Sequence, residues 1–274
     1  MTCLSEHRFG SDEATQSIFL LTFKPSRPHQ PFLLAADIDG TLLGDEQGAD
    51  WLKALSQCCS SSFYLALVTG RSLPSIFELI KENRLPQPDF ICSDVGTELL
   101  VCNDPKNVLG QKYTAQVSSA WDIEKIYTLG EGDGVWRQDF PEGQPRFQAG
   151  FYWDGQDQTL AAFCSRLPHQ QEYYILPSYQ RYIDVIPEPL GKGKVVQFLQ
   201  KEMGLDAAWV VVAGDAGNDR PMFDTGFKGI VPANALEELK TAAVSPWHYH
   251  SPFPSARGVL DGLRHFGFIE ETTY

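Results

Sequence analysis

The chain is short of positive charge. Its 274 residues include 22 Lys and Arg against 35 Asp and Glu, which gives a formal net charge of −13. Such a surface repels nucleic acid and anionic membranes, so we expect neither as a partner. An anionic substrate would need a site that is locally positive against this background.

Patterns for zinc binding, redox chemistry and targeting are missing as well. The six cysteines and six histidines form no C-x-x-C or H-x-x-x-H spacing. The longest early apolar run, Ser17–Phe23, is too short and poorly flanked for a signal peptide or a membrane span. Repeats and low-complexity segments are also absent. These absences predict a soluble, cytoplasmic protein whose cysteines are reduced and mostly structural.

Apolar runs typical of buried strands alternate with segments typical of helices over much of the chain. Strands are expected over 32–38, 63–70, 89–96, 208–215 and 228–235. Helices are expected over 50–59, 73–84, 193–204, 219–226 and 258–268. Near-continuous apolar strands separated by helices indicate a parallel sheet covered on both faces, with right-handed crossovers.

The middle of the sequence differs in composition and in the pattern of polar and apolar residues. From about Asn103 to Asp184 it is rich in Tyr, Trp, Gln and Gly, and polar and apolar residues alternate. This predicts an antiparallel sheet with one or two helices, one of them over 157–167. The expected fold class is therefore α/β, a Rossmann-like parallel-sheet core with an inserted α+β cap domain. The expected division is an N-terminal extension over 1–30, a core formed by 31–103 and 185–274, and a cap over 104–184.

Polar residues follow three of the predicted strands. Asp37 and Asp39 follow the first, Thr69 follows the second, and a loop from Asp215 to Asp219 follows a later one. Each signature alone is commonly an ordinary turn or a helix cap. Because ligands bind at the carboxyl ends of parallel strands, however, all three should converge. Carboxylates gathered in this way call for a cation, and oxygen ligands without His or Cys favour Mg²⁺.

A lysine is expected to complete the site. Lys192 or Lys194 opens a predicted helix, whose first amides would add to an anion-binding site. The segment is not a nucleotide-binding P-loop, because that motif needs glycine where Ile186 stands and Ser or Thr where Gly193 stands. A carboxylate nucleophile, a second carboxylate, a hydroxyl, a lysine and a cation together favour phosphoryl transfer.

With these signatures in this order, the sequence resembles the haloacid dehalogenase superfamily of phosphotransferases, over about residues 32–268. The resemblance implies four catalytic roles: nucleophile Asp37, general acid/base Asp39, phosphoryl-binding Thr69 and motif lysine Lys192. The Mg²⁺ site that it implies consists of Asp37, Asp39, Asp215, Asn218 and Asp219. An aspartate at the second position, Asp39, is similar to phosphatases and phosphomutases rather than to dehalogenases.

Within the superfamily, strings such as "SDVGTEL" and "GDAGNDRPMF" look like the sucrose-phosphate phosphatase group, which includes mannosylfructose-phosphate phosphatase. By that resemblance, the residues expected near the substrate are Gly70, Arg71, Ser72, Glu98, Gln148 and Arg181. The chain departs from the group in the cap, where "PSYQRYIDVIP" replaces a stretch with paired small residues and Gln148 falls near a typically basic position. The cap aromatics either pack within the sheet or stack on sugar faces: Phe151, Tyr152, Trp153, Tyr179 and Tyr182.

The expected function is a Mg²⁺-dependent phosphatase that hydrolyses a sugar phosphate through an aspartyl-phosphate intermediate. The substrate is expected to be a sucrose-phosphate-like disaccharide or a hexose phosphate. Two alternatives stay open, namely a phosphomutase of the same superfamily and a catalytically silent sugar-binding regulatory domain. The expected partner is a small-molecule sugar phosphate, and the expected state is a monomer or small homo-oligomer.

Overall fold

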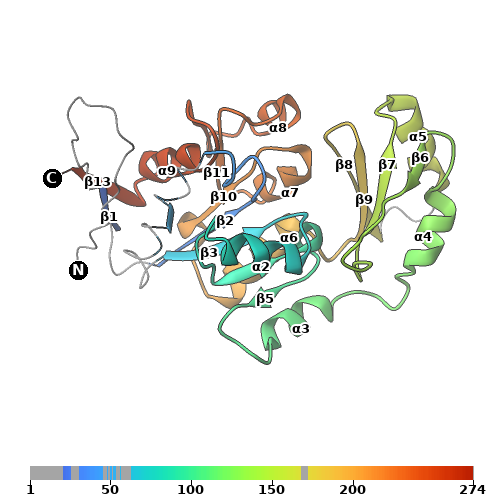
Figure 1. Cartoon of the computed structure of the whole chain (residues 1–274), viewed down its shortest axis with the longest axis horizontal. Helices are drawn as coiled ribbons and strands as arrows, with labels where there is room; N and C mark the ends of the chain where they lie inside the picture. The colour runs from blue at the N-terminus through green and yellow to red at the C-terminus, as the bar shows by residue number, and fades with distance from the viewer. Residues whose placement is uncertain are drawn as a thin grey trace.

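The computed structural model describes residues 21–25, 31–45, 63–167 and 172–273, with isolated positions between 46 and 62. Most of the helix expected over 50–59 and most of the expected N-terminal extension lie outside the described residues. The part of the extension that is described, β1 (Leu21–Pro25), pairs antiparallel with β13 (Ile269–Thr273). This pair lies at the end of the molecule opposite a separate antiparallel sheet (Figure 1).

The larger sheet has the strand order β12-β11-β10-β2-β3-β4-β5. Its strands are β2 (Phe32–Ala36), β3 (Phe63–Val68), β4 (Phe90–Cys92), β5 (Leu100–Val101), β10 (Val210–Ala213), β11 (Lys228–Val231) and β12 (His248–His250). Neighbouring strands run parallel except for β4 and β5, which are antiparallel. The predicted parallel-sheet core is therefore confirmed.

Helices cover both faces of this sheet, and that is why its strands read as continuous apolar runs. The helices are α2 (Leu73–Lys81), α3 (Val108–Thr114), α6 (Lys192–Glu202), α7 (Arg220–Phe223), α8 (Glu237–Ala242) and α9 (Ser255–His265). In β2, Phe32 and Leu34 pack with α2 and α9, whereas Leu33 and Ala35 pack with α3, α6, α7 and α8. Burying a side chain as large as Phe32, Leu33 or Leu34 stabilises the fold by about 1.5–3 kcal/mol. Among the described residues, no helix is long and apolar enough to cross a bilayer.

The smaller sheet, called the cap sheet below, has the antiparallel order β6-β7-β9-β8. Its strands are β6 (Val135–Arg137), β7 (Ala149–Trp153), β8 (Tyr173–Ser178) and β9 (Tyr182–Pro187). Helices α4 (Ile123–Gly130) and α5 (Asp157–Arg166) pack on one of its faces, on the side away from the core (Figure 1). The predicted antiparallel sheet is thus present. Strand β9 extends to Pro187, beyond the expected cap boundary at 184. Helix α3 lies within the expected cap range, but its Tyr113 packs in the core.

The strand expected over 89–96 is shorter in the structure and ends at Cys92. A 3₁₀ turn, η1 (Asp94–Gly96), follows it, with positive φ angles at Asp94 (52°), Val95 (61°) and Gly96 (75°). A β-branched residue such as Val95 rarely adopts this conformation. The apolar run in the sequence did not predict this turn after β4.

The hydroxyl group of Tyr113 joins η1 to the start of α6. Tyr113 is buried, and its Oη lies 3.0 Å from the Gly96 carbonyl oxygen and accepts a hydrogen bond from the Gly191 amide at 3.1 Å. We predict that Tyr113→Phe lowers the free energy of unfolding by about 1–2 kcal/mol, because these buried groups lose a partner. Urea denaturation measures this.

The matched control for that variant is Tyr174→Phe. Tyr174 is exposed and its hydroxyl donates to the partly exposed Glu188 at 3.1 Å, so its removal should change stability by less than about 0.5 kcal/mol. Equal losses in the two variants would contradict the proposed role of the Tyr113 hydroxyl.

Candidate active site

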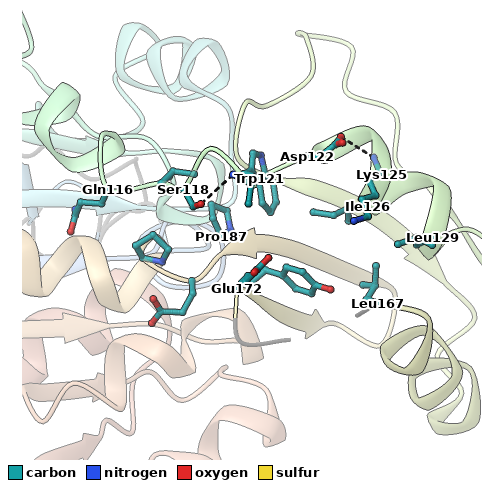
Figure 2. A pocket seen from close by; sticks show the side chains of 15 residues that line it. Gln116, Ser118, Trp121, Asp122, Lys125, Ile126, Leu129, Leu167, Glu172 and Pro187 are labelled. Atoms are coloured by element: carbon teal, nitrogen blue, oxygen red, sulfur yellow. Dashed lines mark hydrogen bonds between the residues drawn. The ribbon is translucent and has the colours of Figure 1, made fainter. Parts of the chain in front are cut away.

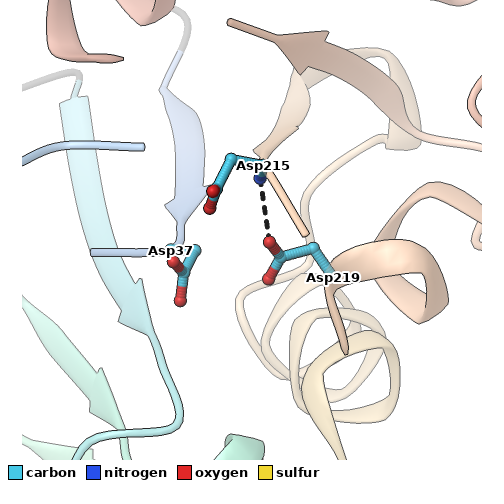
Figure 3. Close-up of side chains that lie close together, drawn as sticks. All are labelled: Asp37, Asp215 and Asp219. Atoms are coloured by element: carbon cyan, nitrogen blue, oxygen red, sulfur yellow. Dashed lines mark hydrogen bonds between the residues drawn. The ribbon is translucent and has the colours of Figure 1, made fainter. Parts of the chain in front are cut away.

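Three buried carboxylates meet at the carboxyl end of the core sheet. Asp37 follows β2, Asp215 follows the neighbouring strand β10, and Asp219 lies in the 3₁₀ turn η3 (Gly217–Asp219) (Figure 3). Each offers an oxygen atom, and these atoms lie within 4.8 Å of one another. The Asp37 amide still donates to the Ala213 carbonyl at 3.0 Å, so the strand pairing itself fixes where Asp37 stands. The convergence expected from the sequence is therefore observed.

Of the two lysines considered, Lys192 reaches the carboxylates. Its Nζ lies 2.8 Å from Asp37 Oδ1 and 2.5 Å from Asp219 Oδ1, and its side chain is 1% exposed. Lys194 instead pairs with Glu188 at the surface, at 2.8 Å. The first residue of α6 can come this close to η1 only because Gly96 has no side chain, since a Cβ there would lie 2.7 Å from the Lys192 amide nitrogen.

Asp219 holds the loop after β10 in place in addition to carrying a charge. Its Oδ2 accepts hydrogen bonds from the backbone amides of Asp215 at 2.9 Å and Ala216 at 3.0 Å, while Oδ1 accepts from Lys192. Both oxygens are thus occupied, so Asp219 ties the lysine to the loop after β10. The remaining buried carboxylate, Asp215, accepts a hydrogen bond from Thr41 at 3.2 Å.

The cluster carries more negative charge than Lys192 can neutralise. Burial raises the pKa of Asp37 to about 7, against the opposing effect of Lys192. Burial, followed by the charges of Asp219 and Asp37, raises the pKa of Asp215 to about 8. Burial alone would lower the pKa of Lys192, but Asp219 and Asp37 more than offset it and raise that pKa. A bound divalent cation would neutralise this excess of negative charge among the oxygen ligands.

Asp39 stands beside this cluster and is held by Arg71. The Arg71 guanidinium makes a two-pronged ion pair with Asp39, Nε to Oδ2 and Nη2 to Oδ1, both at 2.7 Å. Nη1 of Arg71 also donates to Ser75 at 2.9 Å. Thr69 is buried just before this arginine, and its hydroxyl accepts from the Arg71 amide at 3.2 Å. Arg71 therefore contacts the expected acid/base residue directly.

A cavity of about 600 Å³ between the core and the cap sheet opens onto these residues. The core contributes Asp37, Asp39, Thr69, Gly70, Arg71, Val95 and Asn218 to its wall. The cap contributes Gln138, Phe140, Gln148, Ser178, Tyr179, Arg181, Tyr182 and Asp184. Two residues expected near the substrate, Ser72 and Glu98, do not line it. Ser72 Oγ instead contacts Glu142 of the cap, where its hydroxyl bridges the two parts of the molecule.

Asp184 is the functional candidate that the sequence analysis missed. It is buried in β9 and accepts a hydrogen bond from Gln148 Nε2 at 2.7 Å, while burial raises its pKa to about 6. Gln148 Oε1 is buried without a hydrogen-bond partner among the described residues. Alternation along β9 places Asp184 on the same face as Tyr182, and this period-two pattern was the available signal.

A second cavity, of about 330 Å³, lies where the chain passes between core and cap (Figure 2). Its wall includes Trp121 before α4, Lys125 in α4, Glu172, and Pro187 at the end of β9. None of the predicted catalytic residues is among the described residues that line it. The candidate active site is therefore the cavity that contains Asp37.

The chain was compared with known proteins. A family model described as sucrose-6F-phosphate phosphohydrolase matches residues 30–267. The chain belongs to this family. The predicted membership of the haloacid dehalogenase superfamily, near the sucrose-phosphate phosphatases, is thus confirmed, as is the predicted class of enzyme, a phosphatase.

Two relatives and one solved structure illustrate the family. A mannosylfructose-phosphate phosphatase from Agrobacterium fabrum is 32% identical over 248 residues, covering 86% of this chain and 96% of the relative. A glucosylglycerol-phosphate synthase from Pseudomonas anguilliseptica is 30% identical over 239 residues, and the match covers 86% of this chain but 31% of that protein. The structure of sucrose-phosphatase from Synechocystis sp. PCC6803, in complex with sucrose and phosphate, matches with a TM-score of 0.78 at 27% identity, covering 87% of this chain and 99% of that one.

The raised carboxylate pKa values predict a pH-dependent response to magnesium. Asp37 and Asp215 ordinarily titrate near 3.8, so between that pH and about 7 to 8 the folded, metal-free protein holds protons that the unfolded chain has released. Its stability therefore falls as the pH rises across this window. Because Mg²⁺ replaces those protons, MgCl₂ should raise the melting temperature more at about pH 8 than at about pH 5.5.

Differential scanning fluorimetry in EDTA and in MgCl₂ measures this response. Asp215→Ala should weaken it, whereas Asp224→Ala, which removes an exposed carboxylate paired with Arg220, should leave it intact. An equal rise in melting temperature with MgCl₂ at both pH values would argue against a cation site at these residues. So would an Asp215→Ala variant that keeps the full rise.

Proposed function

We propose that this chain is a Mg²⁺-dependent phosphatase that hydrolyses a phosphate ester of a sugar through an aspartyl-phosphate intermediate. The observation that carries the proposal is the buried Lys192, which is held between Asp37 and Asp219, with Asp37 itself in the wall of the cavity between core and cap sheet. A nucleophilic carboxylate, a fixed positive charge and a second carboxylate at the cavity wall are the groups that phosphoryl transfer requires.

In the first step, an oxygen of Asp37 attacks phosphorus, and the bond from phosphorus to the sugar oxygen breaks. Asp39, once it is released from the ion pair with Arg71 and carries a proton, gives that proton to the departing sugar oxygen. In the second step, Asp39 takes a proton from water as the water oxygen attacks phosphorus. The bond from phosphorus to Asp37 then breaks, and inorganic phosphate and the free carboxylate are formed.

The charge on the transferred group is balanced by fixed donors. Lys192, which contacts Asp37, and the Thr69 hydroxyl at the cavity wall would bind the phosphoryl oxygens, and fixed donors of this kind are usually the largest electrostatic contribution to catalysis. The buried carboxylates, which exceed the positive charge of Lys192, fit a divalent cation. Mg²⁺ held by Asp37, Asp215 and the neighbouring Asp39 and Asn218 would supply further neutralisation of those oxygens.

Two observations support a sugar as the alcohol part of the ester. The relatives are named for phosphates of sucrose, mannosylfructose and glucosylglycerol. The cap wall of the cavity also mixes aromatic rings with the polar groups of Gln148, Arg181 and Asp184. We propose that residues 104–184 act as a specificity cap on a core formed by 31–103 and 185–274, and that the substrate is a phosphorylated disaccharide or hexose.

We predict that Asp37→Asn reduces phosphate release by at least about 10⁴-fold, because the nucleophile is lost while the fold is kept. A colorimetric phosphate assay on sucrose 6F-phosphate, mannosylfructose phosphate and fructose 6-phosphate measures it. Asp45→Asn, an equal change in the same loop, is the control and should retain activity. Undiminished turnover by Asp37→Asn would refute the assigned nucleophile.

The same assay separates the alternatives. A phosphomutase would form an isomeric sugar phosphate and release no inorganic phosphate, which chromatography of the reaction products detects. A silent sugar-binding domain would bind the esters and leave them unchanged. Either result with wild-type protein across the panel would overturn the proposed phosphatase activity.

A further inference from the structure

Tyr179 of the cap lines the catalytic cavity from the tip of the β8–β9 hairpin. Strand β8 is an edge strand of the cap sheet and lies against η3 of the core, the turn that contains Asp219 (Figure 1). Tyr179 comes directly after β8 and lines the same cavity as Asp37 and Thr69. The cap therefore places a phenol group in the wall of the cavity that holds the assigned nucleophile.

The backbone of this turn is unfavourable for a tyrosine. Tyr179 and Gln180 are the central residues of the turn 178–181, which is closed by a hydrogen bond from the Arg181 amide to the Ser178 carbonyl at 3.1 Å. Their φ angles are 53° and 49°, as in the turns that match the twist of a β-hairpin, where glycine and asparagine are the usual residues. The left-handed conformation costs energy for other residues, and residues held in this way cluster at functional sites.

Packing of the ring does not account for the strain at this turn. The Tyr179 side chain is 43% exposed. Its one aromatic contact among the described residues is with Tyr182, whose ring it meets edge-on with 6.4 Å between the centroids. Because stabilisation follows the apolar area removed from water, a ring this exposed adds little to the hydrophobic core. The strained position is better explained by a role of the side chain in the cavity.

The hydroxyl group of Tyr179 is an unused donor near the buried carboxylates. It makes no hydrogen bond to any residue that the structure describes, whereas the Tyr113 hydroxyl has partners. Burial, followed by the charges of Asp215, Asp37 and Asp219, raises the pKa of Tyr179. The phenol end of the side chain therefore lies toward these carboxylates, and it keeps a proton to donate at neutral pH.

A phosphoryl group bound at Asp37 would supply the missing acceptor. In the proposed function this group contacts Lys192 and Thr69, and it occupies the cavity that Tyr179 also lines. Its oxygens carry negative charge, which a donor already fixed in the cavity wall stabilises during transfer. A neutral phenol can donate to such an oxygen without adding to the excess of negative charge around Asp37.

We propose that Tyr179 is a further catalytic residue, whose phenol hydroxyl donates a hydrogen bond to an oxygen of the phosphoryl group bound at Asp37. This inference rests on the proposed phosphatase function. Tyr179 forms and breaks no covalent bond and keeps its proton in both steps. The cap thereby contributes one donor to the chemistry, and the ester reacts fastest while the hairpin tip lies over the carboxylates.

The test compares two esters that share the phosphoryl group and differ in the alcohol. Tyr179→Phe should lower kcat/KM about tenfold or more on both sucrose 6F-phosphate and p-nitrophenyl phosphate, because a hydrogen bond to a charged oxygen is lost while the ring stays. Tyr174→Phe, the same change at an exposed position of β8, should leave both values unchanged. A loss confined to the sugar ester would assign the hydroxyl to sugar recognition and overturn the proposal, as would full activity in Tyr179→Phe.

A second pair of variants tests why the strained turn is kept. Tyr179→Gly and Gln180→Gly each remove one non-glycine residue with positive φ, so neither should lower the melting temperature. Only Tyr179→Gly should lose kcat/KM on both esters, because Gln180→Gly keeps the phenol. Equal losses of kcat/KM in the two variants would make the backbone of the turn responsible and would contradict the role of the hydroxyl.

Binding of orthovanadate, measured by isothermal titration calorimetry in MgCl₂, tests the contact without turnover. The vanadate oxygens stand in for those of the transferred phosphoryl group, so Tyr179→Phe should weaken binding about tenfold and Tyr174→Phe should not. Equal affinity in Tyr179→Phe and wild type, or no binding by wild type, would overturn the contact. A wild-type protein that shows this dependence on Tyr179 but releases no phosphate from any sugar ester keeps the contact and loses the proposed function.

Discussion

The buried ammonium group of Lys192 holds the catalytic end of the molecule together. It links Asp37, at the end of β2, to Asp219, in the turn after β10. Removing the lysine would leave the buried carboxylates to repel one another without a positive charge between them. Other features follow from this need, since Gly96 admits the start of α6 beside η1 and the Tyr113 hydroxyl fixes that junction.

In the proposed function, chemistry and selectivity are divided between the two sheets. Three of the groups assigned to phosphoryl transfer, Asp37, Asp39 and Thr69, follow strands of the core sheet. The groups assigned to recognition, among them Gln148 and Asp184, belong to the cap part of the cavity wall. Arg71 takes part in both groups, because it forms an ion pair with Asp39 and also lines the cavity.

The sequence predicted most of the core and little of the cap chemistry. Strands such as β2 are buried on both faces, so their apolar runs are unambiguous, and the strand-end rule then brings Asp37 and Asp215 together. The ion pair of Arg71 with Asp39 and the buried Asp184 depend on rotamers and strand register, which composition does not encode. The reversal at Val95 was missed because a β-branched residue seldom adopts positive φ. Short edge strands such as β5 and β12 were missed because they lack a long apolar run.

The central claim is that Asp37 carries the phosphoryl group during turnover. Wild-type protein mixed with a phosphorylated disaccharide, quenched in acid within one turnover and digested, can be examined by mass spectrometry for the modified peptide. The account predicts one phosphoryl group on the peptide that contains Asp37, released as inorganic phosphate when the quench is delayed. A phosphoryl group on any other residue, or phosphate release with no modified peptide at any time, would contradict it.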